Sequence, residues 1–274
     1  MIMKPEPYMA PSKRCVVIPD VHQDVAWVRR IFERERVLES DTQVVFLGDY
    51  FDSWKKPPAV AGVAETCRFL LDTRAALQGR CVFLLGNHDI QYWEARMPCA
   101  SHRSLRRLHN KCGASFSHNA AKKVTKGLPV EFWLEARLFV VAHGWLLSHA
   151  GVAAAYWPTA DAVEDSLGLL DEKCKAALAM MRHGQQPLLA AGKTRGGDAP
   201  IGGLTWLDWT DEFSDDLPPP QIVGHTADDA GARQKGRSWC IDGHQACYAV
   251  LKNGGCEVRN VMPIPSIVVP SIGH

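Results

Sequence analysis

Five short apolar runs along the chain each end abruptly in polar residues. Each run has the length of a strand and is rich in β-branched or aromatic residues, which is typical of strands buried on both faces. The runs, each with the polar residues that follow it, are Cys15–Pro19 before Asp20 and His22, Val44–Leu47 before Gly48 to Asp52, Val82–Leu85 before Gly86 to Asp89, Trp145–Ser148 before His149, and Gln221–Val223 before Gly224 and His225. The sequence therefore predicts five strands with polar carboxyl ends.

Two amphipathic segments separate the first three runs. Val25–Leu38 and Ala59–Leu77 carry apolar residues at helical spacing among charges. The order strand, helix, strand, helix, strand predicts parallel βαβ units. The carboxyl ends of neighbouring strands then lie side by side, so polar residues that are distant in the sequence can share one site.

The second half of the chain follows a different pattern. Leu138–Val141 and Trp145–Ser148 flank a turn at His143 and Gly144, which predicts a hairpin. Further short strands are expected at Cys240, Tyr248–Leu251 and Val258–Met262, and we expect them to form a second sheet.

The region between the fourth and fifth runs has no strand pattern. It contains an expected helix from about Thr159 to Met181, a Gly-rich loop at Gly192–Gly197 and an aromatic, acidic stretch at Trp206–Trp209. Gly192-Lys193-Thr194 is not a phosphate-binding P-loop, because position 187 is Pro where that motif needs Gly. We interpret residues 1–274 as a single domain with a cap-like insertion at about 153–219.

Charge and cysteine content limit the classes of function. A net charge of +1 disfavours nucleic acid as a partner, and no segment approaches the roughly 18 apolar residues of a membrane span. The first residues lack a continuous apolar stretch, so we expect no signal peptide. Nine cysteines, an odd number without a CxxC pair, favour reduced thiols and a cytoplasmic location.

One segment is strongly basic. Residues 95–130 contain no Asp or Glu. The cations there are Arg96, Arg103, Arg106, Arg107, Lys111, Lys122, Lys123 and Lys126. Such a run is usually a solvated helix face, but its position directly after the third polar cluster also suits an anionic substrate.

Six of the polar residues at the strand ends form a candidate set of metal ligands. The set consists of Asp20, His22, Asp49, Asn87, His149 and His225. Two carboxylates, one amide oxygen and three imidazoles suit borderline divalent metals such as Mn, Fe or Zn, and contain too much nitrogen for a Mg or Ca site.

This ordered series resembles the calcineurin-like metallophosphoesterase superfamily, whose blocks read DxH, GDxxD, GNH(D/E), H and GH. The matching blocks are Asp20-Val21-His22, Gly48–Asp52, Gly86–Asp89, Ser148–Gly151 and Gly224-His225-Thr226, with an echo at Cys240–Gly243. The last two blocks and Gly202–Trp206 look most like the bacterial and phage protein-phosphatase and diadenosine-tetraphosphatase side of the superfamily.

The resemblance implies a fold class and a metal centre. The fold would be α/β, an α/β/β/α sandwich of two mixed β-sheets flanked by helices, with the active site at the carboxyl ends of the strands. Asp20, His22 and Asp49 would hold one divalent ion, most often Mn, with Fe and Zn as alternatives. Asp49 would bridge to a second ion held by Asn87, His149 and His225, and a metal-bridging hydroxide would attack phosphorus.

The same resemblance gives roles to two further residues. His88 would be the general acid that protonates the leaving group, and Asp52 would orient that imidazole. Asp89 is interpreted as a cap, or as a residue that supports the ligands, rather than as a ligand itself. Where the serine/threonine phosphatases have DRG, this chain has Asp52, Ser53 and Trp54, so the phosphate-binding Arg is missing. Arg195 and Arg96 are the candidates to replace it.

Three functional hypotheses remain open at the level of sequence. The first is a metal-dependent phosphomonoesterase of the protein-phosphatase type, acting on a phosphorylated small molecule or a phosphoprotein. The second is hydrolysis of a nucleotide or dinucleoside polyphosphate, with Trp54 or Trp93 as a stacking surface, although both are more often packing residues. The third is a non-catalytic interaction scaffold on the same fold.

Overall fold

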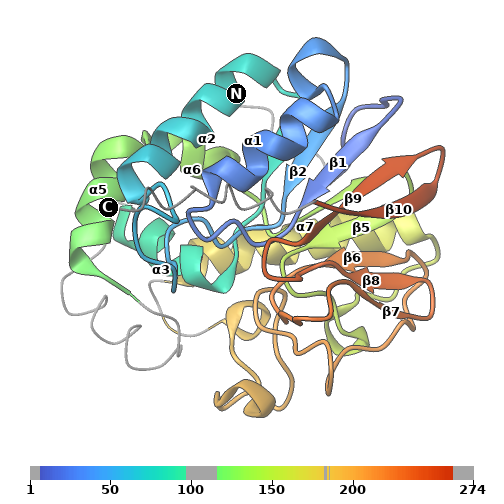
Figure 1. The fold of residues 1–274 in the computed structure, drawn as a ribbon. Helices are drawn as coiled ribbons and strands as arrows, with labels where there is room; N and C mark the ends of the chain where they lie inside the picture. The colour runs from blue at the N-terminus through green and yellow to red at the C-terminus, as the bar shows by residue number, and fades with distance from the viewer. Residues whose placement is uncertain (1–6, 97–115, 182–183, 185, 262–274) are drawn as a thin grey trace, which may run out of the picture.

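Strand pairing divides the strands of the described residues between two five-stranded mixed sheets (Figure 1). The computed structural model describes residues 7–96, 116–181, 184 and 186–261. In the first sheet three parallel strands are extended by an antiparallel pair, in the order β10-β9-β1-β2-β3. Its strands are β1 (Cys15–Ile18), β2 (Gln43–Phe46), β3 (Cys81–Phe83), β9 (Cys247–Lys252) and β10 (Gly255–Asn260).

The second sheet begins with the hairpin that the sequence predicts. β4 (Phe139–Ala142) pairs antiparallel with β5 (Trp145–Ser148). Parallel pairing then continues from β5 to β6 (Gln221–Val223) and from β6 to β8 (Ser238–Cys240), and β7 (Arg233–Lys235) closes the edge antiparallel to β8.

Helices cover the outer faces of the sheets (Figure 1). The α-helices are α1 (Val25–Arg34), α2 (Val63–Leu77), α3 (Asn87–Arg96), α5 (His118–Gly127), α6 (Val130–Glu135) and α7 (Val163–Met180). Short 3-10 helices are η1 (Val37–Glu39), η2 (Ala154–Tyr156), η4 (Pro187–Leu189) and η5 (Lys193–Arg195).

The alternation of side chains along each strand explains the layers. In β1, Val16 belongs to the buried cluster that includes the inner side of α1, while its neighbour Val17 packs in a different cluster with Leu147 of β5. In β5, Leu146 points away from the face that carries Leu147, and it belongs to the same buried cluster as Leu170 of α7. Successive side chains thus fill the space between the sheets and the space under the helices. The predicted α/β/β/α sandwich is confirmed.

Several predicted helix boundaries were wrong by a few residues. The helix expected to reach Leu38 ends at Arg34, because Arg36 adopts a left-handed φ of 50° before the 3-10 turn η1. The helix expected from Ala59 begins at Val63, after Gly62 with φ 76°. The helix expected from Thr159 also begins later, at Val163.

The expectation that all the late strands form the second sheet was also wrong in part. Cys240 lies in β8 of the second sheet, as predicted. β9 and β10, however, extend the first sheet, because β9 pairs with the edge of β1 that β2 leaves open, with Val16 opposite Val250. Met262 lies outside the described residues.

Loops after the parallel strands of the two sheets meet at one place. The His225 amide, after β6, donates to Asp20 Oδ1, after β1, at 3.0 Å. The His149 ring, after β5, hydrogen-bonds the carbonyl of Leu47, after β2, at 3.0 Å. These contacts join the carboxyl ends of both sheets into one site.

Candidate metal centre

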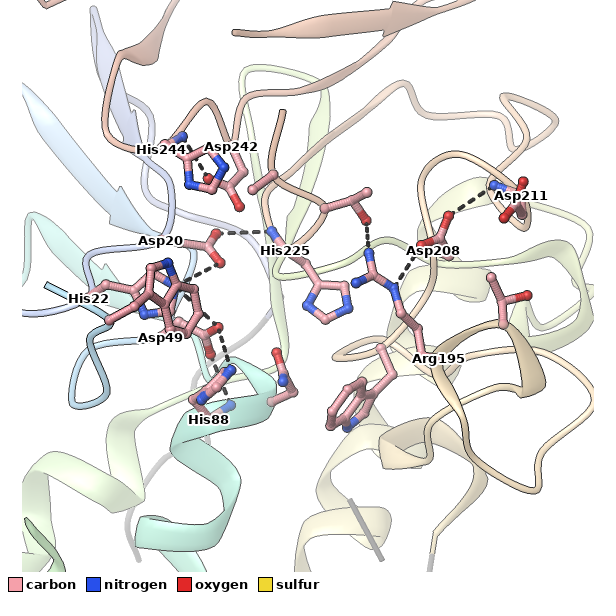
Figure 2. Close-up of a pocket in the computed structure, with 16 residues that line it drawn as sticks. Asp20, His22, Asp49, His88, Arg195, Asp208, Asp211, His225, Asp242 and His244 are labelled. Atoms are coloured by element: carbon pink, nitrogen blue, oxygen red, sulfur yellow. Dashed lines mark hydrogen bonds and ion pairs between the residues drawn. The ribbon is translucent and has the colours of Figure 1, made fainter. Parts of the chain in front are cut away.

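A pocket of about 640 Å³ lies at the junction of the two sheets (Figure 2). Five of the six predicted ligands line it, and the sixth, His149, is fully buried beneath it. The five that line it are Asp20, His22, Asp49, Asn87 and His225. The structure therefore brings together all six residues that the sequence selected from five separate strand ends.

His149 lies at the centre of one group of acceptors. Its Nε2 is 2.9 Å from Asn87 Oδ1, 3.2 Å from His225 Nδ1 and 3.6 Å from Asp49 Oδ2. Its Nδ1 must donate a proton to the Leu47 carbonyl at 3.0 Å, because a carbonyl oxygen only accepts. In the neutral ring Nε2 is then an acceptor. Its lone pair faces the acceptor oxygens of Asn87 and Asp49, with no proton between them.

His22 lies at the centre of a second group in which acceptor atoms face one another. His22 Nδ1 hydrogen-bonds the Asp52 carbonyl at 2.8 Å, which directs the lone pair of Nε2 into the pocket. That Nε2 lies 3.8 Å from Asp20 Oδ2 and 3.9 Å from Asp49 Oδ2. Asp49 Oδ2 therefore approaches an imidazole nitrogen of each group.

Burial sets the protonation of these residues. It lowers the pKa of His22 and of His149 to about 3, and the pKa of His225 is also well below its usual value, so the imidazoles are neutral near pH 7. Burial raises the pKa of Asp20 to about 6, and burial together with Asp20 raises that of Asp49. Neutral imidazoles beside crowded carboxylates are a ligand set that a divalent cation would stabilise.

One buried nitrogen supports the same interpretation. His225 Nε2 is buried and has no hydrogen-bond partner among the described residues. Leaving such an atom unpaired costs about 1–3 kcal/mol, so its persistence in a polar pocket calls for a ligand. The residues present thus fit divalent metal ions.

Glycines at two of the motif positions leave space for the carboxylates. A Cβ on Gly86 would lie 2.1 Å from Asp49 Oδ1, and a Cβ on Gly224 would lie 2.1 Å from Asp20 Oδ1. Both distances are far below van der Waals contact. Gly86 and Gly224 are therefore required by the position of the carboxylates.

We predict that Gly224→Ala weakens manganese binding by about 10–100-fold, because the new methyl group displaces Asp20 from its position. Gly168→Ala is the matched control, since nothing lies within 4 Å of a Cβ there. Calorimetric titration with manganese measures both. Equal affinity in Gly224→Ala and wild type would show that Asp20 takes no part in metal binding.

Asp89 joins the second and third motif loops. Its carboxylate accepts from the amides of Asp49 at 2.6 Å, Tyr50 at 2.9 Å and Gly86 at 2.9 Å. These bonds hold Asp49, which has a left-handed φ of 54°, in place beneath the pocket. Asp89 therefore holds the second and third motif loops together.

His88 lies beside the six candidate ligands in a hydrogen-bonded chain. Its Nδ1 is 2.9 Å from Asp52 Oδ2, and the Tyr92 hydroxyl donates to Asp52 Oδ1 at 2.6 Å. Its Nε2 lies 4.0 Å from Asp49 Oδ2, so the free end of the ring points into the pocket. Sequence reasoning missed Tyr92, although its position four residues after His88 on α3 indicates a shared helix face.

The sequence profile of the calcineurin-like phosphoesterases matches residues 13–229, which include all of these residues. The chain belongs to this family. A comparison with curated protein sequences gave no match. The family assignment confirms the resemblance described above and makes the protein a phosphoric ester hydrolase.

Solved structures share the fold of this phosphoesterase at low sequence identity. A cold-active protein-tyrosine phosphatase from a psychrophilic Shewanella species has a TM-score of 0.61 and 16% identity, covering 93% of this chain and 82% of its own. A protein serine/threonine phosphatase from Saccharomyces cerevisiae has a TM-score of 0.50 and 13% identity, covering 96% of this chain and 86% of its own. A protein proposed to be a diadenosine tetraphosphatase aligns more distantly, with a TM-score of 0.46, 15% identity, and coverage of 92% and 96%.

Arg195 places a cation opposite the candidate metal ligands of the phosphoesterase (Figure 2). Its Nε forms an ion pair with Asp208 at 2.7 Å, and its Nη2 donates to Thr226 Oγ1 at 2.7 Å. These bonds orient the guanidinium at the pocket wall, where other N–H groups of the fork can bind an anion. Sequence reasoning selected Arg195 but not Thr226, whose position next to His225 was the available signal.

Arg96 is the other residue predicted to bind phosphate. Arg96 is the last residue of α3, and its side chain lies outside the described residues. Much of the basic segment after it, residues 97–115, also lies outside them. A phosphate-binding role for Arg96 stays a prediction.

The segment after β8 adds two residues, Asp242 and His244, to the pocket. Asp242 is buried, and burial together with Asp20 raises its pKa to about 8. The backbone amide of His244 donates to Asp242 Oδ1 at 3.3 Å, and His244 Nε2 lies 3.4 Å from Asp229. The side chains of Asp242 and His244 lie beside the candidate metal ligands but belong to neither of the two groups.

Proposed function

We propose that this chain hydrolyses phosphate monoesters at a dinuclear divalent-metal centre. The observation that supports the proposal best is the position of Asp49, whose Oδ2 lies 3.9 Å from His22 Nε2 and 3.6 Å from His149 Nε2. A carboxylate between two groups of lone pairs suits a bridge between two cations. Mixed imidazole and oxygen ligands favour manganese, with iron or zinc as alternatives.

The two groups of residues would each hold one ion. The first ion would take Asp20, His22 and Asp49, and the second would take Asp49 together with Asn87, His149 and His225. When bound, the ions supply positive charge that neutralises phosphate oxygens and lowers the pKa of a water towards neutrality.

The remaining steps belong to side chains of the chain itself. Asp52 accepts from His88 Nδ1, which orients the ring so that in its imidazolium form a proton on Nε2 faces the pocket. An alkoxide is a poor leaving group, so we assign His88 the donation of that proton to the ester oxygen. Tyr92 holds the second oxygen of Asp52 and so fixes the orientation of the pair.

Arg195 would bind the phosphate from the side of the insertion. We retain a single domain with a cap-like insertion at about 153–219, because Thr194, Arg195, Trp206 and Asp208 line the pocket from this segment. Helix α7 of the same segment packs its buried side into the main core, so only part of the insertion covers the site.

Cell location belongs to the proposal as well. No helix in the described residues is long and apolar enough to cross a membrane. The seven cysteines in the described part of the chain are all free. We infer a cytoplasmic location from these thiols, since oxidising compartments favour disulfides.

Phosphate release from p-nitrophenyl phosphate tests the proposed function. The manganese-loaded protein should hydrolyse this substrate, a chelator should abolish the activity, and added manganese should restore it. The substrate is proposed to be a phosphorylated small molecule, a nucleotide or a phosphoprotein, so phosphopeptides, mononucleotides and dinucleoside polyphosphates complete the screen. A protein that binds manganese but hydrolyses none of these would support the scaffold hypothesis instead.

A further inference from the structure

Trp54 is an exposed tryptophan on the wall of the pocket. Its side chain is 61% exposed, whereas the other eight tryptophans, all within the described residues, are buried or half-buried. Trp93, the other residue considered for stacking, packs against the main core instead. Ligand pockets are lined largely by apolar and aromatic side chains, so an exposed indole on the wall of this polar pocket suits a ligand contact.

The indole ring of Trp54 lies next to the proposed general acid. Its centroid is 4.4 Å from that of His22 and 5.7 Å from that of His88. Arg195 lines the same pocket and, with Asp208, lies across His225 from His88 in Figure 2. The pocket therefore has a cationic wall suited to phosphate and an aromatic wall beside the acid.

The neighbour of Trp54 anchors this part of the loop. The Lys55 ammonium donates to Asp24 at 3.1 Å and to Gln245 at 2.9 Å, which ties the loop to α1 and to the segment after β8. The Lys55 amide also donates to Ser53 Oγ at 3.1 Å. An anchored aromatic side chain loses less conformational freedom when a ligand packs on it.

The position of the acid determines what Trp54 can contact. His88 can protonate the leaving oxygen only within hydrogen-bond reach, so the group attached to that oxygen must lie beside His88. Trp54 is the large apolar side chain at that wall. An aromatic ring bonded directly to the ester oxygen would reach it, whereas a nucleobase is separated from its phosphate by a ribose.

We propose that Trp54 forms the leaving-group subsite and selects phosphate monoesters whose ester oxygen is carried by an aromatic ring. This inference rests on the proposed function, because it takes His88 as the acid. The ring packs against the indole, while the phosphate lies between the metal ligands and Arg195. Trp54 directly follows Ser53, which stands where the serine/threonine phosphatases have their phosphate-binding Arg, and it recognises the other half of the ester.

Trp54→Ala tests the proposal against Trp54→Phe, which keeps an aromatic ring. With phenyl phosphate, kcat/KM should fall about tenfold in Trp54→Ala and much less in Trp54→Phe. With propyl phosphate, both variants should stay within about twofold of wild type, since an alkyl chain gains little from stacking. Comparing each variant with wild type on one substrate cancels the intrinsic reactivity of the ester.

Leu134→Ala is the control for loss of an exposed apolar side chain, because Leu134 is 64% exposed and does not line the pocket. It should leave both substrates unchanged. Equal losses for phenyl and propyl phosphate in Trp54→Ala would overturn the proposal and leave Trp54 as a packing partner of His22. A larger loss for a nucleoside monophosphate than for phenyl phosphate would also overturn it.

A binding measurement decides the question without catalysis. Phenylphosphonate should bind the manganese-loaded wild type about tenfold more tightly than methylphosphonate, and Trp54→Ala should remove the difference. Equal affinities in wild type would contradict the proposal. If wild type released phosphate from no ester, the proposed function would fail, and the phosphonates would still show whether Trp54 recognises an aromatic ring.

Discussion

Asp49→Asn should remove metal from both proposed positions at once. Asp49 Oδ2 approaches both His22 and His149, so the substitution neutralises the charge that the two ions would share. The amide is almost the same size, and Asp49 Oδ1 already accepts from the His88 amide at 3.0 Å, so the chain should still fold. Loss of a residue that hydrogen-bonds a metal ligand lowers metal affinity about 10–100-fold. Loss of the shared ligand itself should lower metal affinity further.

Metal content and turnover measured on the same preparation check this prediction. After manganese loading and desalting, wild type should retain two ions per chain and Asp49→Asn fewer than one. Asp161→Asn makes the same chemical change at an exposed position and should behave as wild type. An Asp49→Asn protein that keeps both ions and its activity would show that the bridge is wrongly assigned.

His88→Asn should separate acid catalysis from metal binding. Loss of the proton donor should lower kcat for alkyl phosphates by about 10²–10⁴-fold, because an alkoxide cannot leave readily without a proton. The loss should be much smaller with p-nitrophenyl phosphate, whose leaving group is stable as an anion. Metal content should not change, since His88 Nε2 points into the pocket without joining either group of ligands.

The comparison between substrates is the decisive part of this experiment. Equal losses for alkyl and p-nitrophenyl phosphate would exclude His88 as the acid and leave it a role in positioning. His118→Asn is a suitable control, because His118 is exposed at the start of α5 and does not line the pocket. It should leave kcat unchanged for both substrates.

The sequence was sufficient to select the six candidate metal ligands that meet at the pocket. Asp20, Asp49 and Asn87 each follow a buried apolar run, and parallel strands place such residues at one edge of a sheet. His149 and His225 follow the corresponding strands of the second sheet. Local periodicity and the order of motifs therefore contained the information that defines the site.

Strand pairing could not be predicted in the same way. Periodicity identifies Tyr248–Leu251 as a strand, but the choice of partner depends on which sheet edge is open. β1 offers an edge to β9 because β2 occupies only its other side. The sequence therefore predicted the existence of β9 and not its place in the first sheet.

Contacts made by side chains across loops were also beyond the sequence. Arg195 lies in the Gly-rich loop and Asp208 in the aromatic, acidic stretch that follows it, and nothing in their spacing indicates that they form an ion pair. Trp54 has no periodic context that distinguishes an exposed side chain from a packed one. The role proposed for Trp54 rests on its exposure and on its distance from His88, neither of which can be read from the sequence.

Anomalous diffraction from crystals of the manganese-loaded protein tests the central claim most directly. Data collected at the manganese absorption edge should give two peaks, one bounded by Asp20, His22 and Asp49 and the other by Asp49, Asn87, His149 and His225. Asp49 should contact both peaks. A single peak, or peaks that do not share Asp49, would contradict the account of a dinuclear centre.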